Sequence, residues 1–253
     1  MNKGREIKLK ELSGTRYARI LTYPTSNPGL ADARVKELSA IGVTAICFNG
    51  SALIDGVPIL GKGCVGIVTQ AIIDGAPVAL KMRRLDADRP SMSEEARFLR
   101  LANAVNVGPR LITATRNLIA MELFDGTPLF KWAEVSAHSQ RDLKHIMSDL
   151  LDACFRLDVV GLDHGELSHA PKNVLVGDEG QTCIVDFESA SMVRRVANVT
   201  SLLQYFMFGR ISKSLHTSRI FDEKRRILNA LSRYKGEGSI ENYRNLLQTL
   251  NLR

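Results

Sequence analysis

The chain has 253 residues, of which 45% are hydrophobic and 24% are charged, a composition typical of a globular protein. This length suffices for one large domain or for two small lobes. No run of 18 apolar residues occurs, and the charged N-terminus lacks the apolar centre of a secretory signal. We therefore expect a cytoplasmic protein that does not engage membranes.

Four cysteines lie far apart in the sequence, without a C-x-x-C pair: Cys47, Cys64, Cys154 and Cys183. This spacing argues against a zinc site and against a disulfide framework, and it favours reduced thiols.

The net charge of +7 is unevenly distributed, since residues 1–50 carry +4, residues 51–193 carry −5 and residues 194–253 carry +8. A basic C-terminal tail of this kind could bind RNA or an acidic protein partner. A solvated helical surface is the preferred explanation of the charge, because no RNA-binding motif accompanies it.

The first half of the chain has the pattern of strands with few helices. A short helix over 31–42 is expected to precede a strand over 43–48. Asp74-Gly75 between two apolar runs predicts a hairpin. A helix follows within 89–103, where Ser91 and Glu94 have capping-box spacing, and two strands turn at 116–117.

The second half has a helical pattern. Apolar residues recur at helical spacing over 139–160, and Gly161 ends the pattern. A small hairpin is predicted around 178–180, and the chain beyond Arg194 is mainly helical. We therefore expect a boundary near Gly126, with three parts: an N-terminal extension (1–50), a strand-rich lobe (51–126) and a helical lobe with a basic tail (127–253).

Three glycines form a candidate phosphate-binding loop. Gly61, Gly63 and Gly66 fit G-x-G-x-x-G, and Val68 follows two residues later. Glycines let the backbone approach phosphate oxygens and present its N–H groups. A dinucleotide-binding fold uses the same spacing but requires a helix directly after the glycines. Because a second strand is expected here instead, the pattern favours a loop that covers nucleotide phosphates.

A lysine and a glutamate extend this interpretation. Lys81 lies 15 residues after Gly66 in Val-Ala-Leu-Lys, which is close to the V-A-I-K pattern. Such a lysine requires a carboxylate partner. Glu94 occupies the capping-box position and should turn back toward the helix start. Glu95 shares a helix face with apolar residues and is therefore the better partner for Lys81.

Further motifs lie in the second half: His164-Gly165-Glu166-Leu167, then Asn173, then Asp186-Phe187-Glu188. Together with Met121–Gly126 and the glycine-rich loop, they make residues 58–190 resemble the protein-kinase-like superfamily. The resemblance is stronger to its atypical microbial branches, which include the RIO-type kinases and a group of small archaeal predicted serine/threonine kinases. Those branches have His-Gly-Asp-Leu where this chain has His-Gly-Glu-Leu.

The resemblance implies a two-lobed α+β kinase fold that uses ATP and Mg²⁺, or Mn²⁺, to phosphorylate serine or threonine hydroxyls of a protein. Glu166, Lys81 and Glu95 would act in catalysis, and Asn173 and Asp186 would hold the metal. The nucleotide would contact the loop, the strands after it and the hinge: Gly61, Lys62, Gly63, Gly66, Val68, Ala79, Lys81, Met121, Glu122 and Leu123.

Two departures from the family pattern bear on catalysis. Glu166 is one methylene longer than the usual aspartate, and seven residues lead from it to Asn173 where the pattern H-R-D-L-x-x-x-N has five. The extra residues could relax the segment to suit the longer side chain, or they could mark a site that no longer transfers phosphate. The alternatives are an ATPase or small-molecule kinase with the same site, and a nucleotide-binding pseudokinase that engages RNA or a partner.

Overall fold

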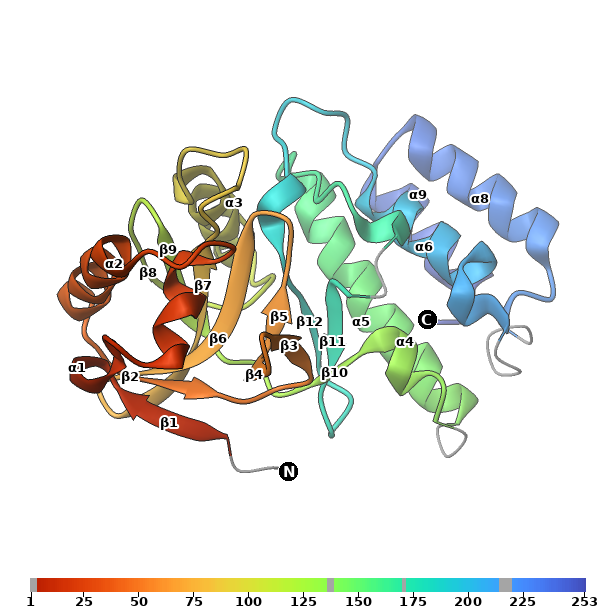
Figure 1. Ribbon diagram of the computed structural model, residues 1–253. Coiled ribbons are helices and arrows are strands. Elements are labelled where there is room, and N and C mark those ends of the chain that lie inside the picture. The colour runs from red at the N-terminus through yellow and green to blue at the C-terminus, as the bar shows by residue number, and fades with distance from the viewer. Residues whose placement is uncertain (1–3, 136–138, 170–171, 214–219) are drawn as a thin grey trace. The chain divides into compact units, whose positions relative to one another are not determined.

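The computed structural model describes residues 4–135, 139–169, 172–213 and 220–253 and combines α-helices with antiparallel sheets (Figure 1). The chain divides into two compact units. The first comprises Met1–Arg97 and Arg110–Leu123, and the second comprises Phe98–Pro109 and Phe124–Arg253. Among the described residues, no helix is long and apolar enough to cross a membrane.

The first unit is built on a seven-stranded antiparallel sheet with the order β1-β2-β6-β7-β9-β8, in which β5 pairs with β6. Its strands are β1 (Arg5–Lys8), β2 (Val43–Phe48), β5 (Gly61–Lys62), β6 (Gly66–Ile73), β7 (Ala76–Arg83), β8 (Leu111–Ala114) and β9 (Leu118–Glu122). A separate hairpin joins β3 (Ala52–Ile54) and β4 (Val57–Ile59). The predicted turn at Asp74-Gly75 is confirmed, because it connects β6 directly to β7.

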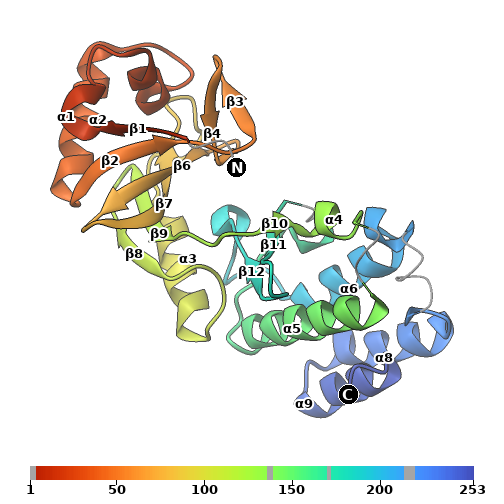
Figure 2. The same cartoon turned by 90° about the horizontal axis from the view of Figure 1, so that it is seen from below.

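The described part of the N-terminal segment, residues 4–50, shares the core of this unit, although we expected residues 1–50 to form an extension ahead of it. Between β1 and β2 the chain forms α1 (Leu9–Leu12), the 3-10 helix η1 (Arg16–Thr22) and α2 (Pro28–Ala40) (Figure 2). Their apolar residues pack with those of β2, β6 and β7. The rings of Tyr17 and Phe48, for example, have centroids 4.7 Å apart. Burial of these side chains makes the segment part of the hydrophobic core that it shares with the sheet.

Helix α3 (Ser93–Ala104) continues from the first unit into the second, with the division falling after Arg97. In the second unit, a three-stranded sheet contains β10 (Thr127–Pro128), β11 (Val174–Val176) and β12 (Thr182–Ile184). The hairpin between β11 and β12 is the one predicted around 178–180.

Five α-helices of the second unit are described beyond α3: α4 (Leu129–Trp132), α5 (Gln140–Val159), α6 (Asn198–Phe208), α8 (Lys224–Gly236) and α9 (Ile240–Thr249). Short 3-10 helices are η2 (Leu167–His169), η3 (Phe187–Ser189) and η4 (Arg210–Lys213). The predicted helix over 139–160 is confirmed as α5. Ser139 caps it reciprocally with Asp142, and Gly161 after it has a φ of 74°.

The basic C-terminal segment packs as an amphipathic helix pair. Tyr234 of α8 and Tyr243 of α9 are buried against Phe155 of α5, and the rings of Phe155 and Tyr243 stack at 4.2 Å. The Tyr234 hydroxyl donates a 2.8 Å hydrogen bond to Asp158. The helical prediction for this segment is therefore confirmed for its described residues.

Candidate functional site

The glycine-rich segment of the first unit is the tip of a hairpin between β5 and β6. Gly61 pairs with Val68 across the two strands, and the Gly63 N–H donates a 2.8 Å hydrogen bond to the Gly66 carbonyl. A strand, β6, follows the glycines directly. The expectation that no helix follows them is therefore confirmed, and a dinucleotide-binding arrangement is excluded.

Lys81 lies on β7, next to this hairpin. It pairs with Val68 of β6, and its side chain passes against Gly66. A Cβ atom at position 66 would lie 2.8 Å from Lys81 Cε and 2.9 Å from Lys81 Cγ. The absence of a side chain at Gly66 is therefore what admits the lysine stem beneath the hairpin.

Lys81 and Glu95 form the expected ion pair. The distance between Lys81 Nζ and Glu95 Oε1 is 2.7 Å, and the two residues are only 4% and 6% exposed. Glu95 comes from the first turn of α3, whereas the competing Glu94 is exposed. Helix phase decides the choice, because Glu95 lies on the buried side of α3.

The four remaining nucleotide-contact predictions fall on β7 and β9 and just after β9. Ala79 pairs with Met121 across these strands, and Leu123 is the last residue of the first unit. The Glu122 N–H donates to the carbonyl of Arg110, at 2.8 Å, and the Glu122 carboxylate accepts from the Arg110 N–H. The N–H of Glu122 is thus already paired within the chain.

In the second unit, the carboxylate of Glu166 is held by two donors. Asn173 Nδ2 donates to one of its oxygens at 2.9 Å, and Ser189 Oγ donates to the other at 2.6 Å. The contact between Glu166 and Asn173 brings together two predicted site residues that lie seven positions apart. Ser189 was not singled out from the sequence, because it directly follows the Asp186-Phe187-Glu188 motif but has no part in its pattern. Residues 170–171, within the lengthened segment, lie outside the described residues.

Asp186 lies beside Asn173, because the Val185 N–H donates to the Asn173 carbonyl at 2.9 Å. The Asp186 backbone is left-handed, with a φ of 68°. Its carboxylate and that of Glu188 approach within 4.8 Å of each other. Carboxylate and amide oxygens are the ligands that Mg²⁺ prefers, so Asn173, Asp186 and Glu188 fit such an ion chemically. Glu188, which occupies the position of the glycine in D-F-G, was not among the candidate ligands predicted from the sequence.

His164 supports this segment from within the core. Its ring is fully buried, Nε2 lies 3.1 Å from the Val185 carbonyl, and its centroid lies 5.0 Å from that of Phe187. Burial lowers the pKa of His164 below its ordinary value. The side chain of Asn198, at the start of α6, accepts from the His164 backbone N–H and donates to Asp158. These hydrogen bonds attach the His164-Gly165-Glu166-Leu167 motif to α5 and α6.

Gly165 is required by its surroundings. Its φ is 89°, and a Cβ there would lie 2.6 Å from the Ser189 carbonyl and would also collide with Arg194. Arg194 in turn donates to Asp163 at 2.5 Å, an ion pair that the sequence patterns did not indicate.

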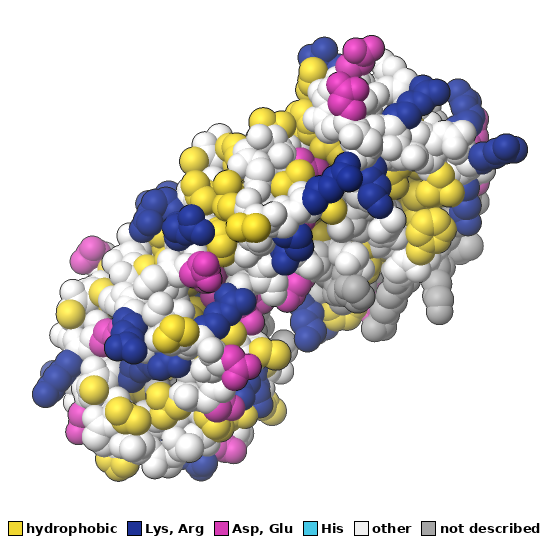
Figure 3. Space-filling view, turned by 90° about the horizontal axis from the view of Figure 1, so that it is seen from above, with side chains coloured by type: hydrophobic (Ala, Val, Ile, Leu, Met, Phe, Trp, Pro, Cys, Tyr) yellow, Lys and Arg dark blue, Asp and Glu magenta, His cyan; other side chains and the backbone are white. Residues whose placement is uncertain are grey.

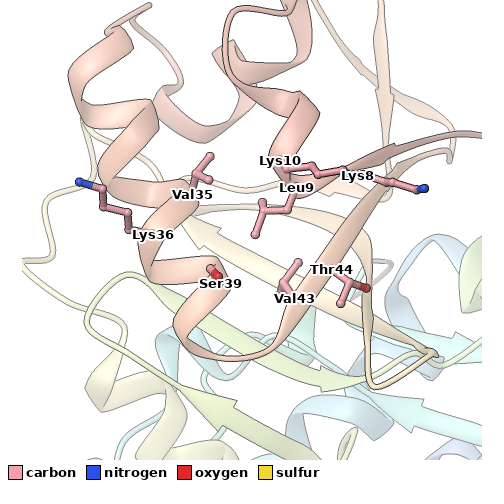
Figure 4. A pocket seen from close by; sticks show the side chains of 8 residues that line it. All are labelled: Lys8, Leu9, Lys10, Val35, Lys36, Ser39, Val43 and Thr44. Atoms are coloured by element: carbon pink, nitrogen blue, oxygen red, sulfur yellow. The ribbon is translucent and has the colours of Figure 1, made fainter.

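A shallow cavity of about 480 Å³ opens elsewhere on the first unit, between β1, α2 and β2 (Figure 4). The side chains of Leu9, Val35 and Val43 line it, while those of Lys8 and Lys36 extend away from it. None of the predicted site residues lines this cavity.

The basic tail was considered as a possible binding region for RNA or an acidic partner. In the face shown in Figure 3, the Lys and Arg side chains lie in several separate groups, with Asp and Glu side chains among them. Charge spread in this way gives no single anion-binding surface on the part of that face that the structure describes.

The architecture defines a mixed α and β protein with a mainly antiparallel sheet. No known protein family matches this chain, and no curated protein is significantly similar to it.

Proposed function

We propose that the protein has a two-lobed kinase-like fold and transfers the γ-phosphoryl group of ATP to a serine or threonine hydroxyl of a protein substrate. The buried ion pair between Lys81 and Glu95, in contact with Gly66, carries this proposal. Replacing such a pair by apolar residues is often neutral or stabilising, so stability alone does not account for it. A lysine cation next to a glycine, whose backbone has no side chain to cover it, is suited to phosphate oxygens.

The residues of the first unit would bind the nucleotide. The hairpin Gly61–Gly66 would approach the phosphates with its backbone, and the Lys81 ammonium would neutralise part of their charge. Ala79 and Met121, which are paired on neighbouring strands, would contact the adenine ring. The adenine edge would bond to the Glu122 carbonyl and to backbone groups of Leu123, because the Glu122 N–H is already paired.

The residues of the second unit would bind the metal and the acceptor. Asn173 and Asp186, with Glu188, would hold Mg²⁺ or Mn²⁺. When bound, the ion supplies positive charge to the phosphate oxygens. Glu166 would accept the proton of the substrate hydroxyl while that oxygen bonds to phosphorus and the bond from phosphorus to ADP breaks. Asn173 and Ser189 would keep the Glu166 carboxylate oriented.

A second candidate is nucleotide binding without transfer. Both oxygens of the Glu166 carboxylate already accept a hydrogen bond from the protein. Both oxygens are thus already engaged by the protein instead of by a substrate hydroxyl. The chain would then use ATP as a conformational ligand in a partner-binding role.

The proposal is tested by incubating the 253-residue chain with γ-labelled ATP, Mg²⁺ and a mixture of serine- and threonine-containing peptides. We expect labelled peptide with wild type and none with Lys81→Met or Asp186→Asn. Glu94→Gln, an exposed change beside Glu95, should label at the wild-type rate. Equal labelling by wild type and Asp186→Asn would refute the proposal. Inorganic phosphate without labelled peptide would indicate an ATPase, and ATP binding without either product would favour the second candidate.

A further inference from the structure

A group of contacts beside the glycine-rich hairpin has no part in the proposed chemistry. Tyr23 follows η1 in the N-terminal segment, and its ring faces two cations. Lys62 Nζ lies 4.7 Å from the ring centroid, and Arg84 Cζ lies 5.0 Å from it. The Tyr23 carbonyl also accepts a 2.9 Å hydrogen bond from the Leu85 N–H. Tyr23 therefore joins the N-terminal segment to β5 and to the chain after β7.

Arg84 connects this ring to the tip of the hairpin. Its Nη1 donates to the Gly63 carbonyl at 2.8 Å, and its backbone N–H donates to the Val65 carbonyl at 2.8 Å. Its Nε and Nη2 donate to the two carboxylate oxygens of Asp86, at 2.9 and 2.6 Å. This two-bond geometry fixes the plane of the guanidinium group. One residue thus restrains two carbonyls of the hairpin tip.

We propose that Tyr23, Arg84 and Asp86, named here the loop clamp, hold the glycine-rich hairpin in the conformation that receives an anionic nucleotide. The clamp residues are positioning residues, because they act on the backbone of Gly63 and Val65. The nucleotide part of this inference rests on the proposed function, whereas the restraint on the hairpin does not. The N-terminal segment thereby controls the mobility of the binding loop.

Cys64, at the tip of the hairpin, provides a built-in reporter. It is exposed, whereas Cys47, Cys154 and Cys183 are buried, so a thiol reagent such as DTNB should modify Cys64 first. Its modification rate in the native 253-residue chain measures access to the hairpin tip. Cys64→Ser identifies the fast phase by removing it.

Two substitutions test the clamp without changing the charge near Cys64. Tyr23→Leu removes the aromatic face that the two cations contact. Losing a cation–π contact of the strength found near protein surfaces should open the hairpin tip more often, so that Cys64 reacts about three- to five-fold faster. Arg84→Lys removes the planar fork and should also accelerate the reaction. Tyr23→Phe keeps the ring and should react as wild type. Arg19→Ala, an exposed change in η1, is the matched control.

Nucleotide affinity supplies the second readout. Tyr23→Leu should weaken the binding of a fluorescent ATP analogue by about the same factor as it raises the thiol rate. Wild-type thiol rates in both Tyr23→Leu and Arg84→Lys would overturn the clamp. Circular dichroism checks the fold, and Arg84→Lys decides the test if Tyr23→Leu does not fold. If ATP fails to slow Cys64 modification in wild type, the proposed function loses support, while the rates without nucleotide still decide the clamp.

Discussion

The ion pair between Lys81 and Glu95 should behave as a buried pair whose two charges depend on each other. Both side chains are nearly inaccessible, and 2.7 Å separates the paired atoms. Glu95→Leu leaves the ammonium group buried without this partner, which should lower the free energy of unfolding by about 3–5 kcal/mol. The double variant Lys81→Met, Glu95→Leu removes both charges and should recover most of that loss. It should nevertheless bind no ATP.

Urea unfolding measures these differences. The single tryptophan, Trp132, lies in the second unit, so far-ultraviolet circular dichroism is the signal that includes the sheet of the first unit. Glu94→Gln is the matched control and should change stability by less than about 0.5 kcal/mol. A loss in Glu95→Leu no larger than in this control would refute the burial argument. A double variant as unstable as the single one would show that the isolated charge is not the cause.

Two further predictions concern the hairpin and the buried histidine. Gly66→Ala places a methyl group against the Lys81 stem and should weaken ATP binding by about 1–3 kcal/mol, measured by calorimetry. Gly61→Ala is the control, because its Cβ would lie 3.9 Å from Val68, and it should weaken ATP binding less. Equal losses of affinity in the two variants would contradict the packing argument. Burial lowers the pKa of His164, so the unfolded state binds a proton more readily than the folded state, and stability should fall as the pH drops below about 6.5. In urea titrations, His164→Gln should flatten this dependence of the unfolding free energy on pH between about pH 7 and pH 5. An unchanged dependence in the variant would refute the assignment to His164.

Local patterns predicted the parts of the fold that depend on neighbouring residues. Asp74-Gly75 sets the turn between β6 and β7, because two residues suffice for a tight hairpin. The capping box at Ser139 starts α5. The pairing of Lys81 with Glu95 was predictable as well, because helix phase places Glu95 rather than Glu94 on the buried side of α3.

Contacts between distant segments were not predictable in this way. The pairing of β1 with β2 joins Arg5 to Phe48, and no periodicity in either strand specifies that partner. The same holds for Ser189 at Glu166 and for Asn198 at His164, which lie 23 and 34 residues apart. Hydroxyl and amide side chains occur throughout surface segments, so their functional positions emerge only once the backbone has brought them together.

The length of the Glu166 side chain has a structural consequence of its own, apart from the length of the segment after it. In the sequence they are two separate departures from the kinase pattern. In the structure, Glu166 uses one oxygen for Asn173 and the other for Ser189, at 2.9 and 2.6 Å. An aspartate on the same backbone would end about 1.5 Å short, one carbon–carbon bond, and would lose at least one of these hydrogen bonds. The longer side chain therefore lets the protein hold both carboxylate oxygens at once, and under the proposed function these two bonds would keep Glu166 oriented toward the acceptor hydroxyl.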